Sequence, residues 1–216
     1  MSLWTIIQIR GLAAGKTRLA GVLDAAAREA LTTRMFDRTL RAIVRLRGSH
    51  ARTLVACAQI DAFARACAAG AQARLDTRGA TLNEAVRHAC THARALGASR
   101  VMIVAADLPW IDAAALQRLE HAAPAHTVAL LADKHGSGTN GLVVPLVRSG
   151  VPAGSGVHAL PDVFAFGAHS LRRHRERFAA AGWPVVVVED PDLGFDVDTP
   201  EDYRALAARA AELSRP

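Results

Sequence analysis

The acidic residues with the clearest chemical pattern lie near the end of the chain, where residues 194–200 read GFDVDTP. If this segment is extended, Asp196 and Asp198 point to the same face, because side chains alternate with a period of two. Two carboxylates this close repel each other unless a cation lies between them. The pair therefore predicts a cation site, and the alternative for Asp198 is a cap of the helix that follows.

A third aspartate, Asp107, follows the unbroken apolar run 101–106. Such a run is typical of a central strand that is buried on both faces. A carboxylate at the end of that strand faces the ligand crevice of an open α/β sheet and offers hard oxygen ligands. Together, Asp107, Asp196 and Asp198 predict a three-carboxylate site for Mg²⁺. The alternatives for Asp107 are a cap of the next turn and a Walker-B-type aspartate.

A basic loop that contains glycine, residues 10–19, follows the first predicted strand and reads RGLAAGKTRL. It is one residue too short for the P-loop pattern GxxxxGK[ST], because three residues rather than four separate its two glycines. We therefore favour a different loop, in which Lys16, Arg10 and Arg18 hold a triphosphate. A true P-loop and a solvated basic turn are the alternatives.

Two further segments contain groups that can bind anions through the backbone. Residues 136–141 form a glycine-rich connection between two predicted strands and include the hydroxyl group of Thr139. Residues 166–170 open a predicted helix and include Gly167 and Ser170. A plain hairpin and an ordinary N-cap are the alternative interpretations.

The elements that must position these residues alternate between short β-rich apolar runs and longer segments of helical period. The predicted strands are 3–9, 53–58, 71–75, 101–106, 127–132, 142–146 and 185–188. The predicted helices are 24–46, 61–69, 82–96, one that starts at its N-cap Asp112, 170–181, and one that opens with Thr199 and Pro200. This alternation predicts a mostly parallel sheet with helices on both faces. We expect a single domain over residues 1–216, with a long loop at 147–166 that can act as a lid.

The composition is that of a globular protein: of 216 residues, 51% are hydrophobic and 21% are charged. No apolar run approaches the roughly 20 residues of a membrane span, and no basic region of a secretory signal precedes the first apolar stretch. We therefore expect a cytoplasmic protein without a membrane partner. The net charge is +6, but the arginines are scattered, so no nucleic-acid surface is predicted. The 3 cysteines form no CxxC pair and are expected to be reduced thiols.

Taken in order, these segments resemble the CofC/FbiD family of guanylyltransferases, which couple GTP to phospholactate, phosphoenolpyruvate or phosphoglycerate in coenzyme F420 biosynthesis. The matching stretches cover most of the chain and are 10–19, Leu82-Asn83, 106–109, Gly138-Thr139-Asn140, Phe166-Gly167-x-x-Ser170-x-x-x-His174 and 196–202. The resemblance implies the three-layer α/β/α nucleotidyltransferase fold (GT-A-like and Rossmann-like), with a mostly parallel mixed sheet.

The resemblance also implies roles for individual residues. These are Asp107, Asp196 and Asp198 for Mg²⁺; Lys16 and its loop for the GTP triphosphate; Asn83 near the nucleoside; and Thr139, Gly167 and Ser170 for the acceptor. Lys16 and Asp107 are accordingly the expected catalytic residues. The chain departs from the family where Arg10 replaces the usual lysine and Gly11 replaces a frequent proline, and its 147–166 connection looks longer than usual.

The implied reaction is guanylyl transfer, in which a phosphate oxygen of the acceptor attacks the α-phosphorus of GTP and pyrophosphate leaves. Such an oxygen is already anionic at pH 7, so the reaction needs no general base. The expected partners are GTP and 2-phospho-L-lactate, phosphoenolpyruvate or 3-phosphoglycerate, and a homodimer is considered as one option for assembly. The alternatives are a molybdenum-cofactor or sugar-phosphate nucleotidyltransferase of the same fold, a P-loop-like NTPase or kinase, and a nonenzymatic nucleotide-binding regulator.

Overall fold

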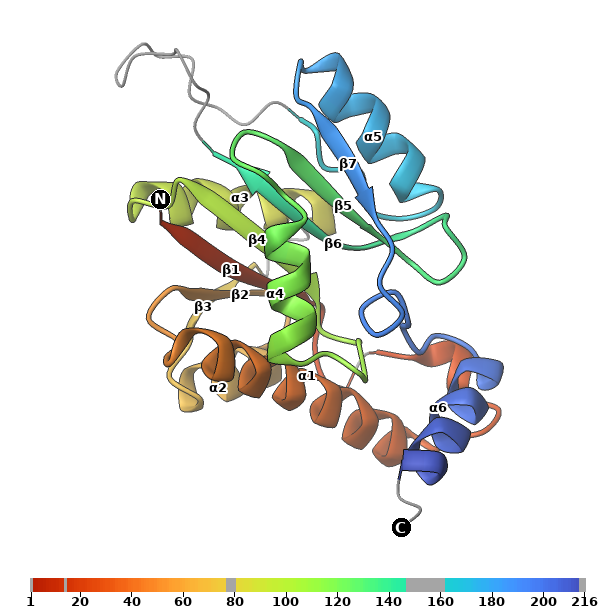
Figure 1. The fold of residues 1–216 in the computed structure, drawn as a ribbon. Helices are drawn as coiled ribbons and strands as arrows, with labels where there is room; N and C mark the ends of the chain where they lie inside the picture. The colour runs from red at the N-terminus through yellow and green to blue at the C-terminus, as the bar shows by residue number, and fades with distance from the viewer. Residues whose placement is uncertain (1, 14, 77–80, 147–161, 214–216) are drawn as a thin grey trace.

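The computed structural model describes residues 2–13, 15–76, 81–146 and 162–213, in which strands and helices alternate (Figure 1). The strands are β1 (Leu3–Ile9), β2 (Thr53–Cys57), β3 (Gln72–Leu75), β4 (Arg100–Ala105), β5 (Val128–Ala132), β6 (Thr139–Pro145) and β7 (Val185–Val188). The helices are α1 (Ala25–Arg47), α2 (Ile60–Ala68), α3 (Leu82–Ala95), α4 (Ala113–His121), α5 (Ser170–Ala180) and α6 (Pro200–Leu213). A short 3-10 helix, η1 (Thr17–Leu19), precedes α1.

The strands form one mixed sheet in the order β3-β2-β1-β4-β6-β5-β7. All neighbouring pairs are parallel except those of β6, which runs antiparallel to both β4 and β5. The carboxyl ends of β1, β4, β5 and β7 therefore lie along one edge of the sheet, together with the first residue of β6. Ligands of open α/β sheets bind at this edge.

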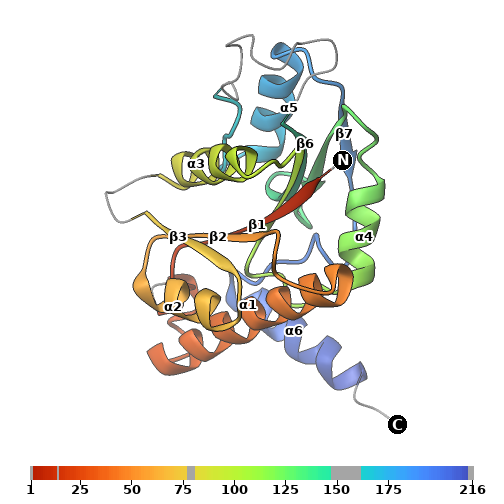
Figure 2. The same ribbon diagram turned by 90° about the vertical axis from the view of Figure 1, so that its left-hand side faces the viewer.

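Helices cover both faces of the sheet, as Figure 2 shows from the side. Apolar residues of α1, α2 and α4 belong to one buried cluster with one face of the sheet, and those of α3 and α5 belong to a second cluster with the other face. Helix α6 lies apart, next to η1 and the start of α1, in a third and smaller cluster. The predicted three-layer α/β/α architecture with a mostly parallel sheet is thus confirmed.

The central strands are apolar throughout because both of their faces are covered. Along β1, Ile7 packs into the cluster on the α1 face and Ile6 into the cluster on the α3 face; along β4, Met102 and Ile103 divide in the same way. All four side chains are fully buried. Burying a side chain of this size stabilises the fold by about 1.5–3 kcal/mol, so these two strands form the apolar centre of the molecule.

Helix starts follow the capping residues expected from the sequence. The side chain of Asp112 accepts a hydrogen bond from the backbone N–H of Ala115 at the start of α4. At the start of α6, the backbone N–H of Asp202 donates to Thr199 Oγ1 over 3.3 Å. Thr199 thus caps α6 as predicted, and the side chain of Asp198 is left for another contact.

One strand boundary differs from the sequence-based expectations. Strand β6 begins at Thr139, whereas the prediction began it at 142, so half of the expected glycine-rich connection 136–141 is strand. Gly141 lies within this strand and packs directly against β4. A glycine is needed there because the carbonyl of Ile103 leaves no room for a side chain. The expected lid falls mainly on 147–161, outside the described residues, and Phe164 just after it is buried in the core. Among the described helices, none is long and apolar enough to cross a membrane.

The close contact at Gly141 predicts a cost for any side chain there. A Cβ at this position would lie 2.9 Å from the carbonyl oxygen of Ile103 and 3.2 Å from Cδ2 of Leu131. Because backbone must move to accept it, we expect Gly141→Ala to lower the free energy of unfolding by about 1–3 kcal/mol in urea denaturation. Gly21→Ala is the control, since nothing lies within 4 Å of its added Cβ. Equal stability of the two variants would contradict this packing.

Candidate active site

Lys16 joins three segments that are far apart in the sequence. Its ammonium Nζ lies 2.6 Å from Oδ2 of Asp107, just after β4, and 2.8 Å from Oδ1 of Asp198, just before α6. The loop that carries Lys16 follows β1, which is parallel to β4, so both segments leave the sheet at the same edge. The structure therefore brings Lys16, Asp107 and Asp198 together where the sequence places a ligand crevice.

The Lys16 side chain is held in a nearly buried position, with 7% of its surface exposed. Burial alone lowers the pKa of its ammonium, but the carboxylates of Asp107 and Asp198 outweigh that effect and leave the pKa raised. The residue also adopts the left-handed conformation, with φ of 60°. A non-glycine residue in this region costs of order 1–3 kcal/mol and occurs most often at functional sites.

Asp196 lies close to the same cluster but lacks an equivalent partner. Its Oδ1 is buried without a hydrogen bond, and the nearest cation is Nζ of Lys134 at 3.7 Å. Burial raises the pKa of this carboxyl, the charge of Asp107 raises it further, and Lys134 only partly offsets both. The unpaired Oδ1 of Asp196 and the negative charge of the neighbouring aspartates would suit an additional cation.

The three aspartates do not form a ready-made metal site. Across the described ranges, no group of three His, Cys, Asp or Glu side chains is arranged to hold a metal ion. Instead, the ammonium of Lys16 is paired with two of the three carboxylates. The site thus differs from the expectation because it includes a lysine. The ammonium of Lys16 reduces the repulsion between the carboxylates, a role that was predicted for a metal ion alone.

A second lysine fixes the segment that carries Asp196 and Asp198. Lys134, in the turn after β5, donates from Nζ to the carbonyl of Asp196 over 2.7 Å and lies 2.6 Å from Oδ1 of Asp202. Its ammonium is also 4.7 Å from the ring centre of Phe195. Lys134 therefore anchors this acidic segment to the edge of the sheet, together with Asn140, whose Nδ2 donates to the carbonyls of Leu193 and Gly194.

Asp202 completes this anchor from the first turn of α6. Its Oδ2 accepts hydrogen bonds from the backbone N–H groups of Asp198 and Thr199, at 2.9 and 2.8 Å. Burial on its own would raise the pKa of Asp202, but Lys134 and these N–H groups lower it to about 2. No role for Asp202 or Lys134 was predicted, because neither spacing nor residue type reveals a contact between the β5–β6 turn and α6.

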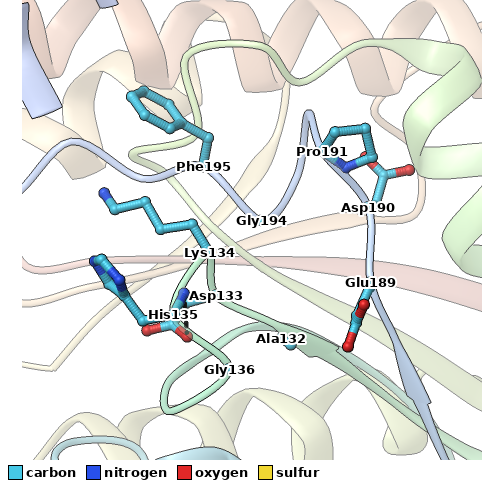
Figure 3. Close-up of a pocket in the computed structure, with 10 residues that line it drawn as sticks. All are labelled: Ala132, Asp133, Lys134, His135, Gly136, Glu189, Asp190, Pro191, Gly194 and Phe195. Carbon is cyan, nitrogen blue, oxygen red and sulfur yellow. Dashed lines mark hydrogen bonds between the residues drawn. The ribbon is translucent and has the colours of Figure 1, made fainter. Parts of the chain in front are cut away.

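A cavity of about 720 Å³ lies beside this anchor, between the β5–β6 turn and the connection that follows β7 (Figure 3). Its lining includes Lys134 and Phe195, but also the carboxylates of Asp133, Glu189 and Asp190. None of the site residues predicted from the sequence lines it. Its acidic lining is unfavourable for a triphosphate, so we assign the nucleotide to the Lys16 side of the segment instead.

The loop around Lys16 is not a P-loop. The backbone N–H groups of Leu12 and Ala13 donate to Oδ2 of Asp61 in α2, at 2.9 and 3.1 Å, so they are not available to a phosphate. The short η1 follows Lys16, whereas α1 begins only at residue 25. A P-loop lysine stands at the start of a full helix. Arg10 and Arg18 are both exposed in this loop.

The residues expected to line the acceptor lie around the start of α5. Ser170, the first residue of α5, is 2% exposed, and Thr139 is 7% exposed. The two segments meet because the N–H of Leu171 donates to the carbonyl of Ser137 over 3.1 Å. Gly167 has a φ of +118°, a conformation that a side chain would strain, and lies beside open space.

Asn83 has a different environment from the one that the resemblance implied. Its Oδ1 accepts from the backbone N–H of Phe166 over 2.7 Å, and its Nδ2 donates to the carbonyl of the same residue over 3.4 Å. Both polar groups of the amide are therefore used within the protein. Asn83 holds the 166–170 segment against α3, and a direct contact with a nucleoside stays a prediction.

Solved structures with the same arrangement define the class of fold. A structure from Desulfovibrio desulfuricans, named as a nucleotide-diphospho-sugar transferase, has a TM-score of 0.74 at 18% identity and covers 99% of this chain and 90% of its own. A nucleotidyl transferase from Methanothermobacter has a TM-score of 0.66 at 14% identity, with 99% coverage of both chains. The fold is that of the nucleotidyltransferases.

Relatives with closer sequences define the family. A family model described as "Guanylyl transferase CofC like" matches residues 3–207. The phosphoenolpyruvate guanylyltransferase of Conexibacter woesei is 35% identical, over 95% of this chain and 87% of its own. The 3-phospho-D-glycerate guanylyltransferase of Phenylobacterium zucineum is 31% identical, over 94% of this chain and 88% of its own. The chain belongs to the CofC-like guanylyl transferase family, as the resemblance indicated.

The depressed pKa of Asp202 predicts how the anchor responds to acid. Because the folded-state pKa of about 2 lies below the ordinary value of 3.8, the ionised carboxylate stabilises the fold fully above pH 4. This contribution disappears as the pH falls toward 2. We expect Asp202→Asn to lose about 2 kcal/mol of unfolding free energy at pH 7.

Urea denaturation at a series of pH values measures this loss, and the difference from the wild type should shrink as the pH falls below 4. Glu201→Gln is the matched control, because this neighbouring carboxylate is 71% exposed and its ion pair with Arg204 lies on the surface. Its removal should leave the unfolding free energy nearly unchanged. A loss for Asp202→Asn that stays constant down to pH 3 would contradict the assignment.

Proposed function

We propose that this protein transfers a guanylyl group from GTP to a small phosphorylated carboxylic acid and releases pyrophosphate. The acceptor class is that of phosphoenolpyruvate, 2-phospho-L-lactate and 3-phosphoglycerate, as in coenzyme F420 biosynthesis. The names of the relatives support guanylyl transfer, and most of those compared are named for phosphoenolpyruvate. A reaction in the cytoplasm, where GTP and such acids are present, is part of this proposal.

The observation that carries the proposal is the contact of Lys16 with Asp107 and Asp198 at the carboxyl edge of the sheet. It places one cation and two carboxylates where the nucleotides of this class of fold bind. Arg10 and Arg18 lie on the same loop and are exposed to solvent, so their guanidinium groups are available to the β- and γ-phosphates. A triphosphate therefore has three cationic side chains within one loop.

Asp107, Asp196 and Asp198 are the residues that would hold Mg²⁺. The buried Oδ1 of Asp196, which lacks a hydrogen bond, and the hard oxygen donors of all three residues fit this ion. When bound, Mg²⁺ would offset the charge of the phosphates. The ammonium of Lys16 has three donors, of which Asp107 and Asp198 use two, so the third could donate to a phosphate oxygen.

The chain's own residues bring two polyanions together. One bond forms between a phosphate oxygen of the acceptor and the α-phosphorus of GTP, while the bond from that phosphorus to the β-phosphate oxygen breaks. The acceptor oxygen is already ionised, so the site needs no base. Lys16 and the arginines of its loop reduce the repulsion between the reactants and stabilise the charge that moves onto pyrophosphate.

The acceptor would bind between the start of β6 and the start of α5. Thr139 and Ser170 offer hydroxyl groups there, and the open space beside Gly167 gives access to the backbone. An acid that carries both a phosphate and a carboxylate can use donors from both elements. This placement separates the acceptor from the cations that hold the triphosphate, so that each substrate has its own binding groups.

The role of Asp107 gives a direct test of the proposed site. Asp107→Ala removes one carboxylate from the Lys16 cluster, and we expect kcat to fall by about 100-fold or more. The unfolding midpoint should fall as well, but Lys16 keeps Asp198 as a partner, so the fold is retained. Release of pyrophosphate from GTP and phosphoenolpyruvate measures the rate. Asp37→Asn is the control, because this aspartate pairs with Arg65 on the surface. A near-normal rate in Asp107→Ala would exclude the proposed site.

The identity of the product tests the reaction itself. The protein is incubated with GTP, Mg²⁺ and a mixture of phospholactate, phosphoenolpyruvate and both phosphoglycerates, and the products are analysed by mass spectrometry. The proposal expects the mass of a guanylylated acid together with pyrophosphate. Transfer from another nucleoside triphosphate, hydrolysis without an acceptor, or tight GTP binding without turnover would each contradict it.

A further inference from the structure

His174 is a buried histidine that the proposed chemistry does not use. It lies in α5, one turn after Ser170, so that both side chains point to the same side of the helix. Its ring is 0% exposed, and both ring nitrogens are in contact with polar groups. Nδ1 lies 3.0 Å from Oγ1 of Thr139, and Nε2 lies 2.9 Å from the backbone nitrogen of Ala165.

These two contacts determine where the ring proton is. The backbone N–H of Ala165 can only donate, so Nε2 of His174 must accept and cannot carry a proton. Burial lowers the pKa of this histidine to about 4, with Arg173 and Arg177 acting in the same direction, so the ring is neutral near pH 7. The single ring proton is therefore on Nδ1.

The direction of the hydrogen bond to Thr139 follows from this tautomer. Nδ1–H donates, and Oγ1 of Thr139 accepts, so the hydroxyl proton of Thr139 cannot be directed to the ring. Among the described residues, the structure gives this hydroxyl no second partner. Thr139 is only 7% exposed, so its hydroxyl proton has little access to water. An acceptor atom of a bound ligand would satisfy this donor.

The position of Thr139 indicates which ligand can supply this atom. Thr139 begins β6, and the register of β6 with β4 pairs Gly141 with Val104, so Thr139 lies beyond that pair toward Asp107. The same hydroxyl also lies on the side where α5 begins, because it contacts Nδ1 of His174, one turn after Ser170. Asp107 and the start of α5 both border the crevice at the carboxyl edge of the sheet, so Thr139 lies at this crevice.

We propose that His174 is a positioning residue that makes the hydroxyl of Thr139 a donor toward an anionic oxygen, phosphate or carboxylate, of the acceptor substrate. This inference rests on the proposed function, since it requires the acceptor to bind at Thr139. The ring of Phe166 packs edge-on against His174 with centres 4.7 Å apart and keeps its orientation fixed. His174 thus acts through Thr139 and does not itself contact the substrate.

Two substitutions separate the two hydrogen bonds of the ring. The amide of asparagine can replace the Nδ1–H donor, whereas that of glutamine can replace the Nε2 acceptor. His174→Asn should therefore keep the bond to Thr139, and His174→Gln should keep the bond from Ala165 but lose the donor. We expect KM for the acceptor to rise about tenfold or more in His174→Gln and much less in His174→Asn, with KM for GTP unchanged in both.

A double-mutant cycle shows whether the effect passes through Thr139. Thr139→Val removes the hydroxyl, so adding His174→Gln to it should raise KM for the acceptor no further. Additive effects, or equal effects of the Asn and Gln variants, would overturn the inference and indicate a structural role only. His50→Gln is the control, because His50 is also buried beside a threonine, Thr53, and should leave this KM unchanged.

The tautomer can be measured whether or not the protein is active. Long-range ¹H–¹⁵N correlation spectra of the wild type should show the proton of His174 on Nδ1. A proton on Nε2 would overturn the inference even if guanylyl transfer is observed. If no phosphorylated acid is guanylylated by the wild type, the proposed function fails and the inference fails with it. If transfer occurs but His174→Gln leaves KM for the acceptor unchanged, only the inference fails.

Discussion

The architecture of this site depends on one buried charge balance, that of Lys16 between Asp107 and Asp198. Lys16 alone would be costly at 7% exposure, because removing an unpaired charge from water is strongly unfavourable, whereas Asp107 and Asp198 remain partly exposed. The pairing holds three segments from the beginning, middle and end of the chain at one edge of the sheet.

The elements and the acidic residues were predictable from the sequence, because both follow from local patterns. Apolar runs identified the strands, and the position of Asp107 after a fully apolar run located the carboxyl edge. The strand order β4-β6-β5 was not predictable, since nothing local shows that β6 lies between two strands that precede it. The start of β6 at Thr139 was missed because its first residues resemble a turn.

The supporting residues of the site were the least predictable part. Lys134 is one of only two lysines in the sequence, but its contact with Asp202 joins residues that are far apart in the chain. His174 was visible only within the family-like pattern, and its role depends on a backbone N–H of a segment that has no regular structure. Roles of this kind depend on tertiary contacts, for which a single sequence contains no periodic signal.

The antiparallel direction of β6 has a consequence for how the protein can vary. A parallel strand at this place would need a crossover connection, whereas β6 returns to the crevice through a turn of only six residues after β5. The same short turn is tied to the acidic segment through Lys134 and to the start of α5 through the carbonyl of Ser137. This short connection at the crevice is therefore one that can change little without moving the residues on both of its sides.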